Sequence, residues 1–487
     1  MSALLALRAA APEDLLSAMG LFILLWSAWS GDRAARAITG LAVLSLGGAA
    51  ALALPALCHG LVGAQASAFG GMYSSDAFAA FAKLLIYGAA IAALLIAPAF
   101  FERLGAMRAE YPLLVLFAAL GMGLMVSATD LVTLYVGLEL NSLAAYVLAA
   151  FYRADSRSAE AGLKYFVLGA LASGILLFGM SLTSGFAGGT GFSAIRASLA
   201  GPMGMGASFG MVFILAGMAF KVSAAPFHMW TPDVYEGSPT PVTMFFATAP
   251  KVAALGLTMR LALFAFGTQT LAWQQIVMAL ALLSIVIGAL GAIGQGNIKR
   301  LLAYSSINNV GFMLVGLAAA TPAGAAAMLT YLAIYVVTSV AGFVAVLMLK
   351  DENGAPVEAI ADLAGLSSQR KVLSACLAMV MFSLAGIPPL FGFWGKFVVF
   401  QAAVAAGQVV LATVAVAASV ISAFYYLKVV KVLYFDEPAG KALGRSDWVH
   451  QALLLAAALA ISPLGYLATR ALAGWTQAAA AALFHAA

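Results

Sequence analysis

The chain has little charge and few of the side chains that hold metals or cofactors. Only 9% of its 487 residues are charged, whereas about a quarter would be in a soluble protein. Its two cysteines, Cys58 and Cys376, form no CxxC pair, and its four histidines show no metal-ligand spacing. The sequence also contains no Walker A motif and no strand-linked GxGxxG. It therefore excludes a soluble protein and disfavours an iron–sulfur, zinc, nucleotide or flavin site on this chain.

Apolar sequence is abundant: 64% of the residues are hydrophobic and the mean hydropathy is +1.03. Runs of roughly 18 to 25 apolar residues are long enough to cross a membrane as helices, and they are too long and uniform for barrel strands. No Ala-x-Ala cleavage site follows the first run, so we expect it to be retained. The sequence predicts an all-α polytopic membrane protein with about fourteen transmembrane helices: 13–29, 37–57, 76–100, 111–128, 130–152, 162–184, 207–230, 242–266, 272–294, 298–319, 325–349, 372–405, 408–434 and 449–473.

Basic residues in the connections predict the orientation. The even-numbered loops and both termini hold three, namely Arg8, Arg196 and Arg470. The odd-numbered loops hold fourteen: Arg33, Arg36, Arg103, Arg108, Arg153, Arg157, Lys299, Arg300, Lys350, Arg370, Lys371, Lys431, Lys441 and Arg445. Because positive loops stay on the cytoplasmic side, both termini are predicted to face the periplasm. The positive net charge is thus a topology signal, and no nucleic-acid partner is expected.

Some charges remain inside the predicted spans. Glu139 is the only acid well inside one, whereas seven basic residues are: Lys83, Lys164, Lys221, Lys251, Arg260, Lys396 and Lys428. Arg260 and Lys428 lie near span ends, where we expect them to reach the headgroups. Lys164 is also close to a span end, and position alone favours the same interpretation for it. Lys83 is about two turns in and stays open.

Four charged residues are deeper: Glu139, Lys221, Lys251 and Lys396. Each would cost roughly 2.5 to 3.5 kcal/mol at a helix centre. A static salt bridge would explain only one lysine, because one acid neutralises one base. A buried lysine without a partner readily loses its proton. The set therefore predicts proton transfer across the membrane.

Prolines interrupt the same spans. A proline cannot donate to the carbonyl four residues earlier, and broken helices at membrane depth are tolerated where they line a cavity. The carbonyls expected to be freed are Val222 by Pro226, Phe246 by Pro250, and Leu384 and Ala385 by Pro388 and Pro389. Spans seven and twelve are five apart, an odd number, which predicts two inverted five-helix repeats at 111–266 and 272–435. Helices 1–3, in residues 1–110, and helix 14, in residues 449–487, would lie outside the repeats.

Three stretches carry a family resemblance: "AFKVSAAPFHMWTPDVYEGSPTPVTMFFATAPK", "GQGNIKRLLAYSSINNVGFMLVGL" and "SLAGIPPLFGFWGKFVVF". They resemble the antiporter-like subunits of proton-pumping NADH:quinone oxidoreductase (respiratory complex I). Within that family the chain looks most like the N subunits, the counterpart of mitochondrial subunit 2, because of "DVYEGSP". Lys396 stands where M subunits tend to have glutamate, and the chain ends without the long lateral helix of L subunits.

The resemblance implies a role for each matching residue. Glu139 matches the glutamate that pairs with the span-seven lysine, here Lys221. Lys251 matches the central lysine, Lys396 the terminal exchange group, and Lys164 a lysine linked to the input half-channel. His228 belongs to the family signature, although helix-end packing is the favoured explanation for it. Weaker candidates for holding water along the path are Tyr304, Ser305, Asn308 and Asn309.

The family implies a bacterial inner-membrane subunit that moves protons outward as quinone is reduced elsewhere in the complex. NADH, FMN, iron–sulfur clusters and quinone would lie on other subunits, with no cofactor or metal on this chain. Partners would be the other membrane-arm subunits, especially adjacent antiporter-like ones, the peripheral subunits and the lipid bilayer. A second interpretation is a subunit of a multisubunit cation/proton antiporter. A third is a structural spacer that has lost the use of its lysines.

Overall fold

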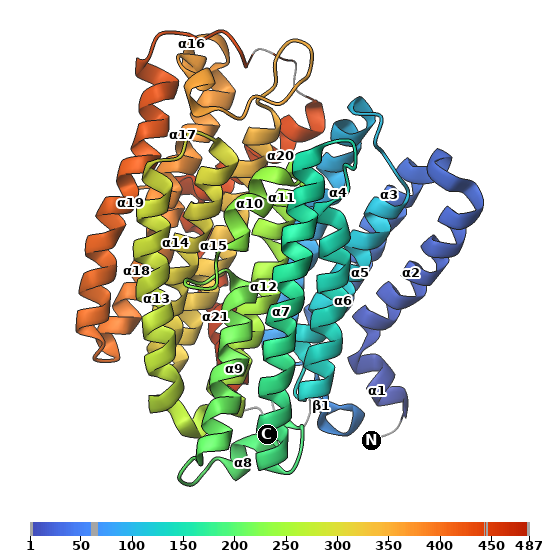
Figure 1. Ribbon diagram of the computed structural model, residues 1–487, viewed down its shortest axis with the longest axis vertical. Helices are drawn as coiled ribbons and strands as arrows, with labels where there is room; N and C mark the ends of the chain where they lie inside the picture. Colours follow the sequence, from blue (N-terminus) through green and yellow to red (C-terminus); the bar gives the residue numbers. More distant parts are fainter. Residues whose placement is uncertain (1–2, 60–66, 443, 445–446, 485–487) are drawn as a thin grey trace.

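The computed structural model describes residues 3–59, 67–442, 444 and 447–484, and these are almost entirely helical (Figure 1). Arg445 and His485 lie outside the described residues. Within these ranges eleven helical segments are long and apolar enough to cross a membrane, or twelve if the bent pair 448–461 and 463–484 is one span. The prediction of an all-helical, multi-pass membrane protein is confirmed.

Aspartates begin several helices of the first third. The carboxylates of Asp76, Asp130 and Asp155 accept backbone N–H groups at the starts of α4, α6 and α7, which satisfies donors that a helix start leaves open. The elements here are α1 (Ala3–Ala9), α2 (Ala11–Ser30), η1 (Gly31–Ala34), α3 (Ala35–Cys58), β1 (Ser67–Ala68), η3 (Phe69–Gly71), β2 (Tyr73–Ser74), α4 (Ala77–Arg103), α5 (Glu110–Ser127), α6 (Leu131–Ala149) and α7 (Ser156–Ala187). The two strands pair antiparallel.

The middle of the chain contains the first interrupted helix. Ser223 adopts a left-handed conformation (φ 65°) and ends α9, and α10 begins only at Trp230. Thr248 separates α11 from α12, two residues before Pro250. The elements are α8 (Phe192–Ser198), α9 (Met205–Val222), α10 (Trp230–Gly237), α11 (Thr240–Ala247), α12 (Ala249–Arg260), the π-helical η4 (Leu261–Ala265) and η5 (Gly267–Gln269).

The second half contains a matching interruption. Gly386, also left-handed (φ 82°), ends α17, and α18 begins after Pro388 and Pro389. The predicted breaks in spans seven and twelve are thus both present. The elements are α13 (Thr270–Ile293), α14 (Ile298–Ala318), α15 (Pro322–Leu347), η6 (Ile360–Leu363), α16 (Leu366–Gln369), α17 (Lys371–Ala385), α18 (Phe391–Ala405), α19 (Val409–Phe435), α20 (Trp448–Ile461), η7 (Pro463–Ala468) and α21 (Thr469–Phe484).

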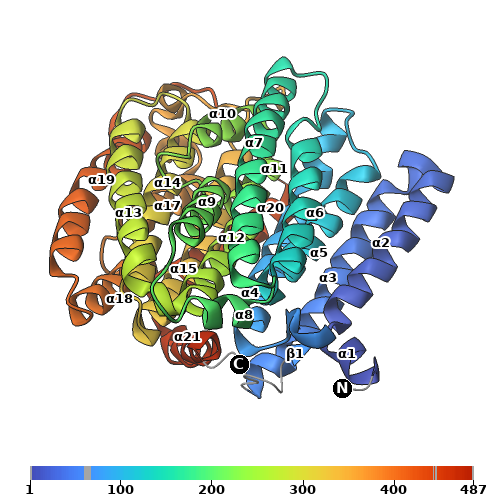
Figure 2. The same ribbon diagram turned by 60° about the horizontal axis from the view of Figure 1, so that its bottom comes forward.

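The helices form one bundle (Figure 1). Helices α2 and α3 lie at one side and α19 at the other, while α14 and α15 are buried along nearly their whole length. Both termini lie at the end of the bundle that carries α8 and β1, where Figure 2 shows α21 passing beneath the other helices. We call the opposite end, which carries Arg103, Arg108, Arg153, Arg157, Lys299, Arg300 and Lys350, the basic end.

Candidate functional site

Lys221 lies at the end of α9, directly before the first break. Its Nζ donates hydrogen bonds to Ser142 Oγ on α6 at 2.9 Å and to Ser173 Oγ on α7 at 3.2 Å. The ring of Tyr146 lies 5.9 Å from the same nitrogen. The lysine is therefore held by two hydroxyls and one aromatic face.

Glu139 lies on α6, three residues before Ser142, so the two side chains share one side of the helix. No ion pair joins Glu139 to Lys221 within the described residues. The Oε1 atom of Glu139 is buried and has no hydrogen-bond partner among them. The pairing that the family resemblance implies stays a prediction.

Lys251 binds the broken end of α9. Its side chain is buried, and Nζ donates to the carbonyl of Val222 at 3.3 Å and to Ser223 Oγ at 3.1 Å. Val222 is the residue whose carbonyl Pro226 was expected to free. The last carbonyls of a helix form the negative end of its dipole, so an ammonium group there is favourable. The carbonyl freed by Pro250, that of Phe246, accepts instead from the hydroxyl of Tyr235 at 3.1 Å.

Lys396 repeats this arrangement at the second break. Its buried Nζ donates to the carbonyl of Ala385, the last residue of α17, at 3.1 Å and to Ser419 Oγ on α19 at 3.2 Å. Ala385 is one of the two residues whose carbonyls the Pro388–Pro389 pair was expected to free. A Cβ on Gly386 would lie 2.9 Å from Lys396 Cδ. Only glycine fits this position without moving the lysine, and its positive φ disfavours other residues as well.

A chain of hydroxyl and amide groups lies near the second break, where Tyr331 packs against Gly395. Tyr331 donates to Asn309 Oδ1 at 2.5 Å, and Asn309 Nδ2 donates to the Ser305 carbonyl at 2.8 Å and to the Tyr426 hydroxyl at 3.3 Å. Ser305 Oγ and the Tyr426 hydroxyl are 2.5 Å apart. Two predicted residues, Ser305 and Asn309, therefore belong to one network with two tyrosines that sequence reasoning did not select.

The other predicted accessory residues lie apart from this chain. Asn308 donates to the Ile285 carbonyl at 2.7 Å and accepts from Ser422 Oγ at 3.1 Å. Tyr304 is half-buried and packs against Gly291. His228 lies in the break between α9 and α10, and its buried Nδ1 has no partner among the described residues. The structure gives these three no common contact with the lysines.

Lys164 lies at the basic end. Its Nζ is 2.6 Å from Glu160 and 2.8 Å from Asp233 on α10, and 40% of its side chain is exposed. Arg300 contacts the same Asp233 at 2.6 Å. Burial raises the pKa of the Asp233 carboxyl, but its bonds to Lys164 and Arg300 outweigh burial and lower the pKa below its usual value. Lys164 thus helps to fix α10, the second half of the broken helix.

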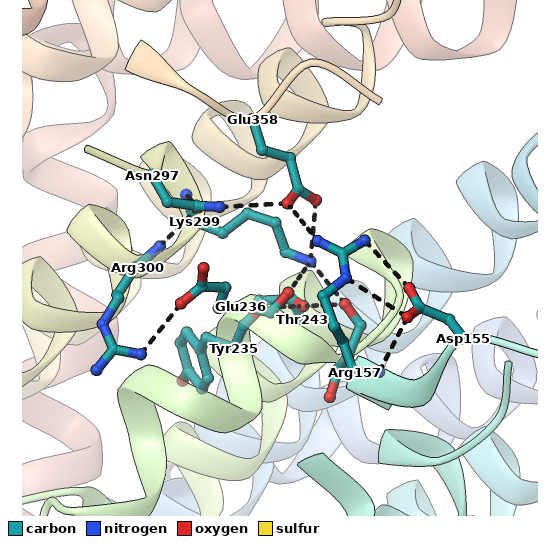
Figure 3. A network of polar contacts seen from close by, with 10 residues as sticks. Asp155, Arg157, Tyr235, Glu236, Thr243, Asn297, Lys299, Arg300 and Glu358 are labelled. Carbon is teal, nitrogen blue, oxygen red and sulfur yellow. Dashed lines mark hydrogen bonds and ion pairs between the residues drawn. The ribbon is translucent and has the colours of Figure 1, made fainter. Parts of the chain in front are cut away.

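A second set of charges holds the other end of α10 (Figure 3). The Nζ of Lys299 donates to the carbonyls of Glu236 at 2.8 Å and Ser238 at 2.7 Å, and it lies 3.5 Å from Glu358. Asn297 and Arg157 also contact Glu358, each through its Oε2 atom. Sequence reasoning counted Lys299 only as a topology signal. Its 3% side-chain exposure could not be seen from its position in a loop.

Two cations near the opposite end need a different interpretation. The expectation that Arg260 reaches the headgroups is wrong: its side chain is fully buried and bonds both oxygens of Asp76, at 2.8 and 2.9 Å. Lys83, left open above, is also buried, 2.6 Å from Glu13 and 2.8 Å from the Tyr73 hydroxyl. Both are neutralised by a carboxylate, and Lys221, Lys251 and Lys396 are in no ion pair within the described residues.

Comparison with known proteins identifies the family. Residues 128–422, more than half of the chain, match the family model described as "NADH:quinone oxidoreductase/Mrp antiporter, TM". The chain belongs to this family. The match includes all five residues predicted to move protons, Glu139, Lys164, Lys221, Lys251 and Lys396.

Named relatives and solved structures agree with this family assignment. The NADH-quinone oxidoreductase subunit N of Erythrobacter litoralis is 64% identical over 97% of each chain, and that of Rhizorhabdus wittichii is 57% identical over 99% of this chain and 100% of the relative. A chain of respiratory complex I from Thermus thermophilus is 33% identical, with a TM-score of 0.79 over 95% of this chain and 99% of that one. A chain of the Mrp complex from Dietzia sp. has a TM-score of 0.85 over 99% of this chain and 98% of that one, but at 23% identity it shows the fold alone.

Proposed function

We propose that this chain is the N subunit of a proton-translocating NADH:quinone oxidoreductase, and that it moves protons along its buried lysines. The observation that carries this proposal is the set of partners around Lys251 and Lys396. Each ammonium group contacts one backbone carbonyl and one serine hydroxyl at a helix break. The family and the relatives named subunit N supply the electron-transfer partner.

These partners serve a lysine in both of its protonation states. A carbonyl only accepts hydrogen bonds, whereas a hydroxyl accepts or donates. The charged –NH3⁺ group donates to both. The neutral –NH2 group still donates to the carbonyl, and the serine turns to donate to its lone pair. Neither state leaves a buried group unpaired, so a proton can leave and return without the cost of an unsatisfied partner.

The proposed route starts at Glu139 and Lys221, whose protons pass through Lys251 to Lys396. Lys251 reaches the end of α9 beside Lys221, since its Nζ donates to the carbonyl of Val222, the residue that follows Lys221. From there the path enters the polar chain of Asn309, Tyr331, Ser305 and Tyr426. Tyr331 packs on Gly395, the neighbour of Lys396. Lys164 takes part as the residue that positions α10, and His228, Tyr304 and Asn308 stay accessory candidates.

The proposed architecture has fourteen spans in two inverted repeats. Counting α2 and α3 as two spans divided by η1, and α17 with α18 as one broken span, brings the apolar segments to fourteen. The two interruptions support repeats at 111–266 and 272–435, because each ends in a left-handed residue and offers its last carbonyl to a lysine. The segments 1–110 and 449–487 would flank the repeats.

The proposed setting is the inner membrane of a bacterium, with the basic end toward the cytoplasm and both termini in the periplasm. NADH, FMN, iron–sulfur clusters and quinone would be carried by other subunits. Those subunits, especially adjacent antiporter-like ones, would be its partners. The described residues hold no group of three or more metal-binding side chains.

The deciding experiment measures NADH-driven proton pumping and quinone reduction in native membranes carrying Lys221→Ala, Lys251→Met or Lys396→Met. Lys428→Met is the matched control, because Lys428 is a half-buried lysine whose Nζ contacts only the Ile293 carbonyl among the described residues. We expect the three relay variants to lose coupled pumping in an assembled complex and the control to keep it. Normal pumping in all four would favour the spacer interpretation, and cation exchange without NADH would favour an antiporter.

A further inference from the structure

A cleft opens at the basic end between the ends of α5, α6 and α7. Its volume is about 980 Å³. The rim carries four charged residues, Asp32, Arg108, Glu110 and Arg153, and the walls are apolar side chains such as Val147 and Phe166. The cleft therefore joins a charged entrance to an apolar interior at one end of the membrane-spanning helices.

The four rim charges divide into a satisfied pair and an open pair. Arg108 and Asp32 form an ion pair, and Asp32 also accepts the backbone N–H of Ala109 at 3.1 Å. Glu110 and Arg153 are exposed, and neither forms an ion pair or side-chain hydrogen bond within the described residues. The cleft thus offers a ligand one guanidinium and one carboxylate that form no ion pair or side-chain hydrogen bond among the described residues, with no net charge on its rim.

The apolar walls continue from this rim toward the middle of the bilayer. Val147 is two residues from the end of α6, and Phe166 is ten residues into α7, or about 15 Å along the helix axis at 1.5 Å per residue. Both side chains are about half exposed, at 49% and 50%, as is Leu163 on the same face of α7 at 64%. This surface has the position and depth of one acyl chain that hangs from a headgroup at the rim.

We propose that this cleft binds one phospholipid whose headgroup carries both a phosphate and a primary ammonium, as in phosphatidylethanolamine. Arg153 would hold the phosphate, because guanidinium matches phosphate oxygens in geometry as well as in charge. Glu110 would accept hydrogen bonds from the ammonium group. The acyl chain would lie against Val147 and Phe166.

Charge complementarity selects this headgroup over two others. A choline headgroup has the same charges but no N–H, so it makes no hydrogen bond to Glu110. A phosphatidylglycerol headgroup is anionic, so it would leave Glu110 unpaired beside a second negative charge. Exposed ion pairs are worth about 0.2–1 kcal/mol, so we expect a preference of about 1.4- to 5-fold over either lipid.

The floor of the cleft gives the site a position beside the buried lysines. Tyr146 lines the cleft and is itself buried, and its ring is the one that faces Lys221 Nζ at 5.9 Å. The lipid would therefore lie on the other side of one aromatic ring from that lysine. The proposal does not depend on the proposed function, because it rests on the cleft and its charges alone.

The test uses the intact purified complex in vesicles that contain a trace of phospholipid with a photoreactive acyl chain. Three preparations differ only in the headgroup of the labelled lipid: ethanolamine, choline or glycerol. Peptide mass spectrometry then measures labelling of 143–167, with the apolar outer face of α7 around Phe178, which is 56% exposed, as the reference for bulk lipid. We expect ethanolamine lipid to label 143–167 about 1.4- to 5-fold more than either alternative, relative to the reference.

The variants Arg153→Gln and Glu110→Gln should each reduce this preference to near one. Both side chains are exposed, so neither variant should disturb folding. Lys371→Gln is the control. Lys371 is an exposed cation, like Arg153, and begins a helix, as Glu110 does, but it lies outside the cleft. Equal labelling by the three lipids would show bulk lipid only, and stronger labelling by the glycerol lipid would show an anionic-lipid site. Absence of labelling would show that a neighbouring subunit covers the cleft. Each of these three results would overturn the proposal.

Discussion

Adding a negative charge next to Lys396 should stop proton transfer without removing the lysine. Ser419 is the residue to change, because its Oγ is 3.2 Å from the ammonium and it lies on α19, outside the break itself. In Ser419→Asp the hydroxyl, which accepts or donates, becomes a carboxylate that only accepts. The charged lysine would gain a fixed counter-ion, and the neutral lysine would lose its donor.

The size of the effect follows from the distance. Two unit charges 3.2 Å apart interact by about 5 kcal/mol at an effective dielectric constant of about 20. Burying the new carboxylate offsets part of this gain. If half remains, the charged form of Lys396 is favoured by about 2.5 kcal/mol, which is close to a 70-fold shift against release of its proton. A step that depends on this release would slow by a similar factor.

The assay is the rate of NADH-driven pumping in vesicles at equal amounts of assembled complex. Ser419→Asn is the matched control, because the asparagine side chain is nearly the same size as aspartate, carries no charge and still contains a hydrogen-bond donor. We expect the aspartate variant to lose at least about nine-tenths of coupled pumping and the asparagine variant to keep most of it. If the aspartate variant pumps as well as the asparagine variant, Lys396 does not exchange its proton during turnover.

Three further changes test the surroundings of the site. Gly386→Ala should impair pumping far more than Gly407→Ala. Both glycines have φ near +80°, which costs an alanine about 1–2 kcal/mol, but only at Gly386 would the Cβ contact Lys396. Similar pumping rates in the two variants would show that this contact is unimportant. Lys299→Met should lower the free energy of unfolding by about 3–5 kcal/mol in detergent-unfolding measurements, because the Glu236 and Ser238 carbonyls lose their donor. Lys441 forms an exposed ion pair with Asp362, so Lys441→Met should change the free energy of unfolding by about 0.5 kcal/mol or less. The bonds of Asp233 to Lys164 and Arg300 lower its pKa, so their contribution to stability should be constant from pH 8 to about 5 and be lost only as the pH falls through that lowered value. Asp233→Asn should show no such loss. If the difference in stability between the two proteins changes near pH 7, this assignment is wrong.

The sequence predicted the helices and breaks well because both follow from local chemistry. Apolar length gives a span, and a proline frees a known carbonyl, so Val222 and Ala385 could be named as acceptors before their partners were known. The partners themselves could not be predicted, since Ser223 and Ser419 differ from many other serines only in where the fold places them. Lys299 and Arg260 were misjudged for the same reason. Each lies near a predicted span end, and only tertiary packing shows that it is buried there.

The cations inside the described part of the bundle fall into two classes, and we propose that the difference separates structural from functional residues. Four of them lie within 3.5 Å of a carboxylate: Lys83 of Glu13, Arg260 of Asp76, Lys299 of Glu358 and Lys350 of Asp447. A counter-ion fixes the charged form, so these residues can hold helices together but cannot readily give up a proton. Lys221, Lys251 and Lys396 have hydroxyls, carbonyls and aromatic rings instead, and no carboxylate within ion-pair distance among the described residues. A chain selected only for stability would have little reason to leave three ammonium groups inside the bundle without an ion-pair partner while supplying one to four others. We therefore propose that the three lysines, which have no carboxylate at ion-pair distance among the described residues, are the groups that change charge.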